Sequence, residues 1–132
     1  MSMKVLIADP DWRFTRAARN YLEAHAHMVI THGSGSHVLE RAKHWQPDLI
    51  ILAGELADAG LLNELYALRD RPAVLLTEHL DRYDRAWRAW QRGGDDLLMK
   101  PVFRTSELHE AIVTALENST TGRWMHPTAA SA

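Results

Sequence analysis

The stretch Pro-Asp-Leu-Ile-Ile-Leu at residues 47–52 decides the fold. Its last four residues are apolar without alternation, which is typical of a strand that is covered on both faces of a parallel sheet. Four similar short apolar runs occur elsewhere in the chain, at residues 5–8, 28–30, 73–76 and 97–99. Together the runs predict five buried strands.

Apolar residues at helical spacing fill the segments between these runs. The first segment places Phe14, Ala17, Ala18, Tyr21 and Leu22 on one helical face. Comparable patterns lie within residues 38–45, 61–68, 80–90 and 108–116. Alternation of strand and helix predicts an α/β fold with helices on both faces of the sheet. The most common arrangement at this size is a flavodoxin-like doubly wound parallel sheet of order 2-1-3-4-5 with five flanking helices.

Length and composition limit the classes of function. The 132 residues fit one domain, expected at residues 1–118, and the Ser-, Thr- and Ala-rich residues 119–132 are expected to form a tail or the start of a linker. The role of Trp124 in that tail stays open. The net charge of -2, with basic residues scattered among acids, gives no basic face for nucleic acid. With no cysteine, no signal peptide and no apolar run long enough for a membrane, we expect a cytoplasmic protein.

Functional side chains in an open parallel sheet gather at the carboxyl ends of the strands. The residues that follow the predicted strands are Asp9-Pro10-Asp11, Ala53-Gly54-Glu55, Thr77 and Lys100-Pro101. A buried ammonium needs a carboxylate partner, so we expect Lys100 to contact Asp9, with Thr77 close by. Glu55 is the second candidate partner, and it could equally be a solvated loop acid. Asp11 precedes a helix, and we expect it to cap that helix.

Four segments in this order resemble receiver domains of two-component response regulators of the chemotaxis-regulator type. They are Lys-Val-Leu-Ile-Ala-Asp at 4–9, Pro-Asp-Leu-Ile-Ile-Leu at 47–52, Ala-Val-Leu-Leu-Thr at 73–77 and Gly-Gly-Asp-Asp-Leu-Leu-Met-Lys-Pro at 93–101. The resemblance implies a cis peptide bond between Lys100 and Pro101. It also implies a pocket with two adjacent acids for Mg²⁺, a phosphoacceptor aspartate, a hydroxyl residue and a lysine.

The chain matches three of these five pocket positions, with Asp9, Thr77 and Lys100. Pro10 stands where the second acid belongs, and it offers no ligand to magnesium. Ala53 stands at the phosphoacceptor position, and its methyl group cannot be phosphorylated. The retained residues are therefore more readily explained as structural remnants than as catalytic groups.

Two further departures agree with a loss of phosphorylation. Leu97 occupies the position of an aromatic residue that, in the family, rotates inward on activation. The loop after Ala53 reads Leu56-Ala57 where the family usually has Met-Pro. We interpret the chain as a degenerate pseudo-receiver that lacks the phosphoacceptor aspartate. We expect it to be no enzyme, to need no cofactor and to act in signalling by binding protein.

The aromatic residues Tyr83, Trp87 and Trp90 share the predicted fourth helix. The resemblance implies a partner surface made by the fourth helix, the fifth strand and the fifth helix. Tyr and Trp are favoured anchors of interfaces, so we expect a protein partner or a homodimer there, although the rings could also pack on the sheet.

Two other classes of function stay open. One is an unorthodox receiver that is phosphorylated on another acid, such as Glu55 or Asp58. The other is a flavodoxin-like small-ligand binder, which would want a Gly-rich or hydroxyl-rich loop after the first strand. Residues 9–12 read Asp-Pro-Asp-Trp there, which disfavours an anion at that helix start.

Histidines gather around the second predicted strand. His25, His27 and His32 flank it, and His37 and His44 follow. No two of them stand at i, i+4 with an acid between them, as in a catalytic zinc helix. We therefore expect no metal site.

Overall fold

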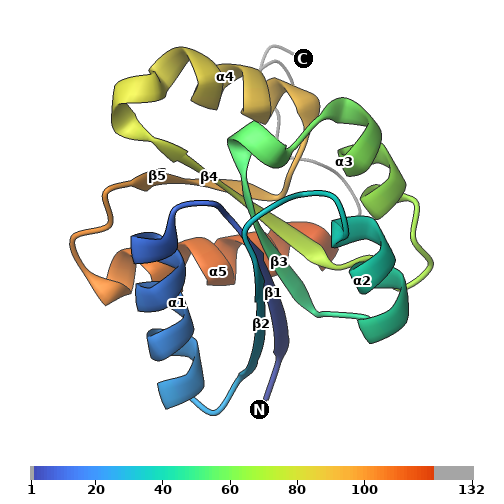
Figure 1. Cartoon of the computed structure of the whole chain (residues 1–132), viewed down its shortest axis with the longest axis horizontal. Helices are drawn as coiled ribbons and strands as arrows, with labels where there is room; N and C mark the ends of the chain where they lie inside the picture. Colours follow the sequence, from blue (N-terminus) through green and yellow to red (C-terminus); the bar gives the residue numbers. More distant parts are fainter. Residues whose placement is uncertain (1, 121–132) are drawn as a thin grey trace.

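The computed structural model describes residues 2–120, apart from the side chains of Tyr83, Ala89, Trp90 and Arg92. One parallel sheet has the order β2-β1-β3-β4-β5 (Figure 1). Its strands are β1 (Lys4–Ala8), β2 (Met28–His32), β3 (Leu49–Ala53), β4 (Ala73–His79) and β5 (Asp96–Lys100). The helices are α1 (Trp12–Ala24), α2 (Val38–Trp45), α3 (Ala59–Tyr66), α4 (Tyr83–Arg92) and α5 (Thr105–Thr120), with short 3₁₀ turns η1 (Gly54–Leu56) and η2 (Leu80–Arg82). The predicted fold class, strand order and five helices are confirmed.

The central strand β3 is buried along its whole length. Leu49 and Ile51 join a core that packs against α1 and α5, whereas Ile50 and Leu52 join a second core that packs against α2 and α3. Successive side chains of a strand point to opposite faces, so an unbroken apolar run fills both layers. This arrangement fixes the carboxyl ends of β1, β3, β4 and β5 in space.

Two elements extend beyond their predicted ends. β4 continues to His79 because Thr77, Glu78 and His79 pair with β5, although the apolar run stops at residue 76. α5 includes Ser119 and Thr120, which we had placed in the tail. Their hydroxyls donate to the carbonyls of Leu116 and Glu117 at 2.7 Å each. The rest of the predicted tail, with Trp124, lies outside the described residues.

Two observations complete the fold. The peptide bond between Lys100 and Pro101 is cis, as expected. Within residues 2–120, no helix combines the length and the apolar character that a membrane crossing requires.

Candidate functional site

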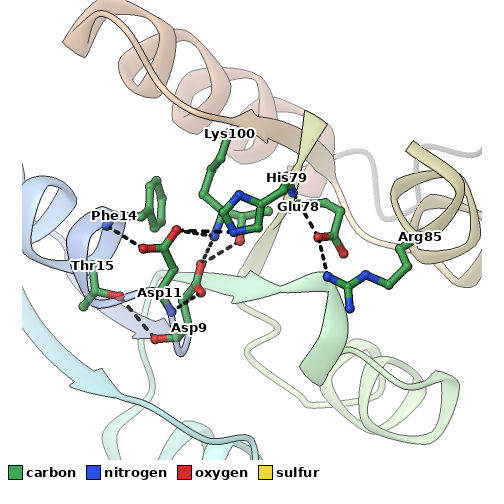
Figure 2. A network of polar contacts seen from close by, with 9 residues as sticks. Asp9, Asp11, Phe14, Thr15, Glu78, His79, Arg85 and Lys100 are labelled. Carbon is green, nitrogen blue, oxygen red and sulfur yellow. Dashed lines mark hydrogen bonds and ion pairs between the residues drawn. The ribbon is translucent and has the colours of Figure 1, made fainter. Parts of the chain in front are cut away.

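Lys100 lies at the carboxyl end of β5, with its ammonium between two carboxylates (Figure 2). Its Nζ is 2.9 Å from Oδ2 of Asp9 and 3.2 Å from Oδ2 of Asp11. The residue is 4% exposed, so both contacts form in a region that is largely shielded from water. The predicted contact with Asp9 is confirmed, and Asp11 is a second partner that we had not predicted. We call Asp9, Asp11, Thr77 and Lys100 the Lys100 cluster.

The carboxylate of Asp9 is the centre of the Lys100 cluster. In addition to the lysine, it accepts hydrogen bonds from the Thr77 hydroxyl at 2.9 Å and from the Asp11 backbone N–H at 2.9 Å. Asp9 is 3% exposed and both of its oxygens are bonded. The expectation that Thr77 lies close by is therefore confirmed, and both oxygens of this buried carboxylate have hydrogen-bond partners.

Asp11 has two tasks. One oxygen accepts the Phe14 backbone N–H at 3.2 Å, which confirms that Asp11 caps α1. The other faces Lys100 and lies 3.5 Å from Nε2 of His79. Burial raises the pKa of the Asp11 carboxyl, but the Phe14 hydrogen bond and the Lys100 ammonium outweigh burial and hold that pKa below its usual value.

The residues that replace the expected receiver groups carry no charge. Ala53 is buried at the end of β3, where it pairs in register with Thr77. Pro10 is exposed between the two acids. Leu97 is half-buried and packs against the core beneath α2 and α3.

Glu55 and Asp58, the two acids considered as alternative phosphoacceptors, lie in the segment that follows β3. Glu55 lies exposed in η1, and within the described residues it forms no ion pair with Lys100. We had considered Glu55 as the second carboxylate partner of Lys100, and Asp11 takes that role instead. Asp58 caps α3, and its carboxylate accepts the Leu61 backbone N–H at 2.7 Å.

A magnesium ion does not fit this set of groups. Mg²⁺ requires near-octahedral oxygen ligands, yet Ala53 and Pro10 have no side-chain oxygen and Asp9 is already bonded to Lys100 and Thr77. Across the described part of the chain, no three His, Asp or Glu side chains are grouped to hold a metal ion.

A cavity of about 730 Å³ opens beside the Lys100 cluster. Phe14 and Val102 form an apolar part of its wall, and Arg13, Glu55 and His79 form a polar part. A side chain of a partner or a small ligand can therefore reach the mouth of the Lys100 cluster.

Sequence reasoning missed an ion pair beneath α4. Glu78 follows Thr77 in β4 and is 3% exposed, and its Oε1 lies 3.2 Å from Nη2 of Arg85 (Figure 2). The same oxygen accepts the His79 backbone N–H at 2.9 Å. The pair fastens α4 to β4. An acid inside a buried strand, followed seven residues later by an arginine, was the available signal.

The predicted interaction surface is described only in part. Trp87 on α4 is 41% exposed, which confirms partial exposure for this ring. The side chains of Tyr83 and Trp90 lie outside the described residues.

The fold is similar to that of solved receiver domains. NtrX from Brucella abortus is 23% identical with a TM-score of 0.77, over 92% of this chain and 28% of that one. A response regulator signal receiver domain from Bermanella marisrubri is 21% identical with a TM-score of 0.72, over 88% of this chain and 99% of that one. A response regulator receiver domain protein from Clostridium thermocellum is 22% identical with a TM-score of 0.70, over 90% and 98%.

These likenesses establish the receiver-type fold. This chain corresponds to 28% of the length of NtrX but to nearly all of the other two proteins. No protein-family model and no curated protein matches the sequence.

Proposed function

We propose that this chain is a pseudo-receiver, a protein-interaction module of two-component-type signalling that works without phosphorylation and without catalysis. One observation carries the proposal. The Lys100 ammonium is neutralised by Asp9 and Asp11 of the same chain, while Ala53 occupies the end of β3.

The electrostatics of phosphoryl transfer explain why this observation matters. A transferred phosphoryl group carries negative charge that a metal ion and cationic side chains must stabilise. Here the cation is already bonded to two carboxylates at 2.9 and 3.2 Å, and no carboxylate stands at position 53 to accept the group. The Lys100 cluster therefore holds one state without metal or phosphate.

Treatment with acetyl phosphate and magnesium tests the absence of phosphorylation. We expect no mass increase in the intact protein and no change in its tryptophan fluorescence. Incorporation of a phosphoryl group would overturn the proposal. The variants Glu55→Gln and Asp58→Asn would then show whether one of these acids is the acceptor, as the alternative reading requires.

We further propose that the face made by α4, β5 and α5 binds a protein partner or a second copy of the chain. Trp87 on α4 and Val113 on α5 both belong to the exposed large apolar side chains, with 41% and 39% exposure. An aromatic anchor on an exposed helix is the kind of residue that contributes most to an interface.

Trp12 provides a matched control for this face, because it is an exposed tryptophan on α1. We expect Trp87→Ala to weaken self-association in sedimentation experiments or capture of a partner in pull-downs, and Trp12→Ala to leave both unchanged. If the two variants behave alike, the face is assigned wrongly.

A further inference from the structure

A second groove lies on the opposite side of α1 from the cavity of the Lys100 cluster. It has a volume of about 380 Å³, within the range of small-molecule sites. Trp12, Arg16 and Arg19 of α1 form one wall, and Thr31 and His32 at the carboxyl end of β2 form the other. Arg13 and Phe14 of α1 line the first cavity instead, and Pro10 lies between the two hollows and lines both.

The charge of this groove is positive. Arg16 and Arg19 are one helical turn apart and both are exposed. Glu23 lies 3.4 Å from Arg19, but both side chains are about half exposed, so water weakens this pair. Asp9 is the acid that lines the groove, and its carboxylate is bonded to Lys100 and Thr77. The two arginines therefore give the lining of the groove a net positive charge.

His32 supplies an independent observation. Its Nε2 atom is buried and has no hydrogen-bond partner within the described structure. An unsatisfied buried polar atom is costly, and most such atoms in folded proteins have a partner. His32 also lines the groove, so a turn of its ring would bring Nε2 within reach of a polar ligand atom that satisfies it.

The exposed ring of Trp12 lines the groove and favours a ligand with a flat group. Its ring is 64% exposed, and the Arg13 guanidinium lies 5.3 Å from the ring centroid. A planar ring of a ligand can stack on an exposed indole.

We propose that this groove binds a small phosphomonoester that carries a planar ring, of the chemical class of a nucleoside monophosphate. Arg16 and Arg19 bind the phosphoryl oxygens, because guanidinium groups pair with phosphate through charged hydrogen bonds. His32 contacts a polar atom of the ligand, and Trp12 stacks on its ring. Asp9 of the Lys100 cluster also lines the groove, but the proposed ligand contacts come from Trp12, Arg16, Arg19 and His32, so this proposal does not depend on the pseudo-receiver function.

Calorimetric titration of the whole chain at low ionic strength tests this site with three probes: AMP, inorganic phosphate and adenosine. We expect saturable binding of AMP, with phosphate and adenosine each weaker by about tenfold or more, because each provides only part of the contacts. Failure of both AMP and phosphate to give saturable binding overturns the proposal. Adenosine binding as tightly as AMP also overturns it, because the arginines would then contribute nothing.

Variants assign the binding to the groove. Arg16→Gln with Arg19→Gln should weaken AMP and phosphate by about tenfold or more. The double variant Arg88→Gln, Arg104→Gln removes the same charge from exposed positions outside the groove and should change neither. Equal losses in both double variants would mean a general charge effect and would overturn the site. Trp12→Ala should weaken AMP but not phosphate, and an unchanged AMP affinity would contradict the stacking contact.

Discussion

The two ends of the sheet each hold a buried ion pair, and the pairs are built differently. At the end where the strands begin, Arg71 binds Asp95 through two parallel hydrogen bonds of 3.0 and 2.9 Å. The Val74 backbone N–H donates to the same carboxylate at 2.7 Å. At the end where the strands finish, one lysine faces two acids beside an open cavity. In the first pair one carboxylate binds a guanidinium through both of its oxygens, whereas in the Lys100 cluster two carboxylates face one ammonium.

This difference separates a structural ion pair from the cluster that we propose to be a degenerate receiver pocket. The Arg71 guanidinium also reaches the Ser119 carbonyl at 3.4 Å, and Asn118 donates to the Asp95 carbonyl at 2.8 Å, so α5 is fastened to this end of the sheet. The Lys100 cluster instead borders solvent through the cavity. Removing one group should therefore be most damaging at the first pair, whose carboxylate is fully buried and also accepts the Val74 N–H.

The largest effect is expected for Asp95→Ala. It leaves the largely buried Arg71 cation without its carboxylate and removes the acceptor of the Val74 N–H. We expect a loss of about 3–5 kcal/mol in the free energy of unfolding, measured by urea denaturation. Asp84→Ala, at an exposed acid of α4, is the control and should change stability by less than about 0.5 kcal/mol. A loss at Asp95 as small as that of the control would refute the structural assignment.

A smaller loss is expected for Asp9→Ala. Lys100 keeps Asp11 as a partner at 3.2 Å, but the Thr77 hydroxyl and the Asp11 N–H lose their acceptor. We expect a loss of about 2–3 kcal/mol in the same measurement. A neutral result would mean that the Lys100 cluster is not held in one state, and the proposed function would lose its main support.

Two arginines of α4 give a third, internal comparison. Arg85 is the partner of the buried Glu78, whose other oxygen has no hydrogen-bond partner in the described structure. Arg88 pairs with Asp84 at the surface, where both side chains are more than 60% exposed. We expect Arg85→Ala to cost about 1–2 kcal/mol and Arg88→Ala less than about 0.5 kcal/mol. Equal melting temperatures of the two variants would show that the Glu78 pair does not fasten α4.

The sequence predicted the fold because the fold depends on periodicity. Runs of apolar residues without alternation marked β1, β3 and β4, and the helical spacing around Phe14 and Leu108 marked α1 and α5. The ends of elements were less predictable. β4 continues through Thr77 and His79 because β5 offers hydrogen bonds there, which no local pattern shows.

The part of the candidate site that could be predicted is the contact for which a charged group required a partner of opposite charge. The Lys100 ammonium needed an acid, and the strand order brought Asp9 to it. Asp11 was predicted only to cap α1, because an aspartate before a helix is a common cap. The sequence could not show that its second oxygen points toward Lys100. Glu78 and Arg85 were missed because Glu78 lies just past the apolar run that marked β4, and its contact with Arg85 depends on how α4 packs on the sheet.

The smallest effect, and the most specific one, concerns Asp11. Because the pKa of its carboxyl is lowered in the folded chain, Asp11 contributes stability above the pKa of the unfolded chain, about 4, and this contribution is lost as the pH falls through the lower folded value. Asn retains the capping hydrogen bond to Phe14 but not the charge next to Lys100. Asp11→Asn should therefore cost at most about 1 kcal/mol at neutral pH.

The pH dependence distinguishes this charge effect from a packing defect. The difference in unfolding free energy between the chain and Asp11→Asn should shrink toward zero only as the pH falls through the lowered pKa of the folded carboxyl, below which the wild-type side chain is also uncharged. Urea denaturation at several pH values measures it, with Asp81→Asn at an exposed acid of η2 as the control. A deficit that persists unchanged at low pH would mean that Asp11 acts through its shape alone. The Lys100 cluster would then contain one effective ion pair, Lys100 with Asp9, and would resemble the Arg71–Asp95 pair instead of differing from it.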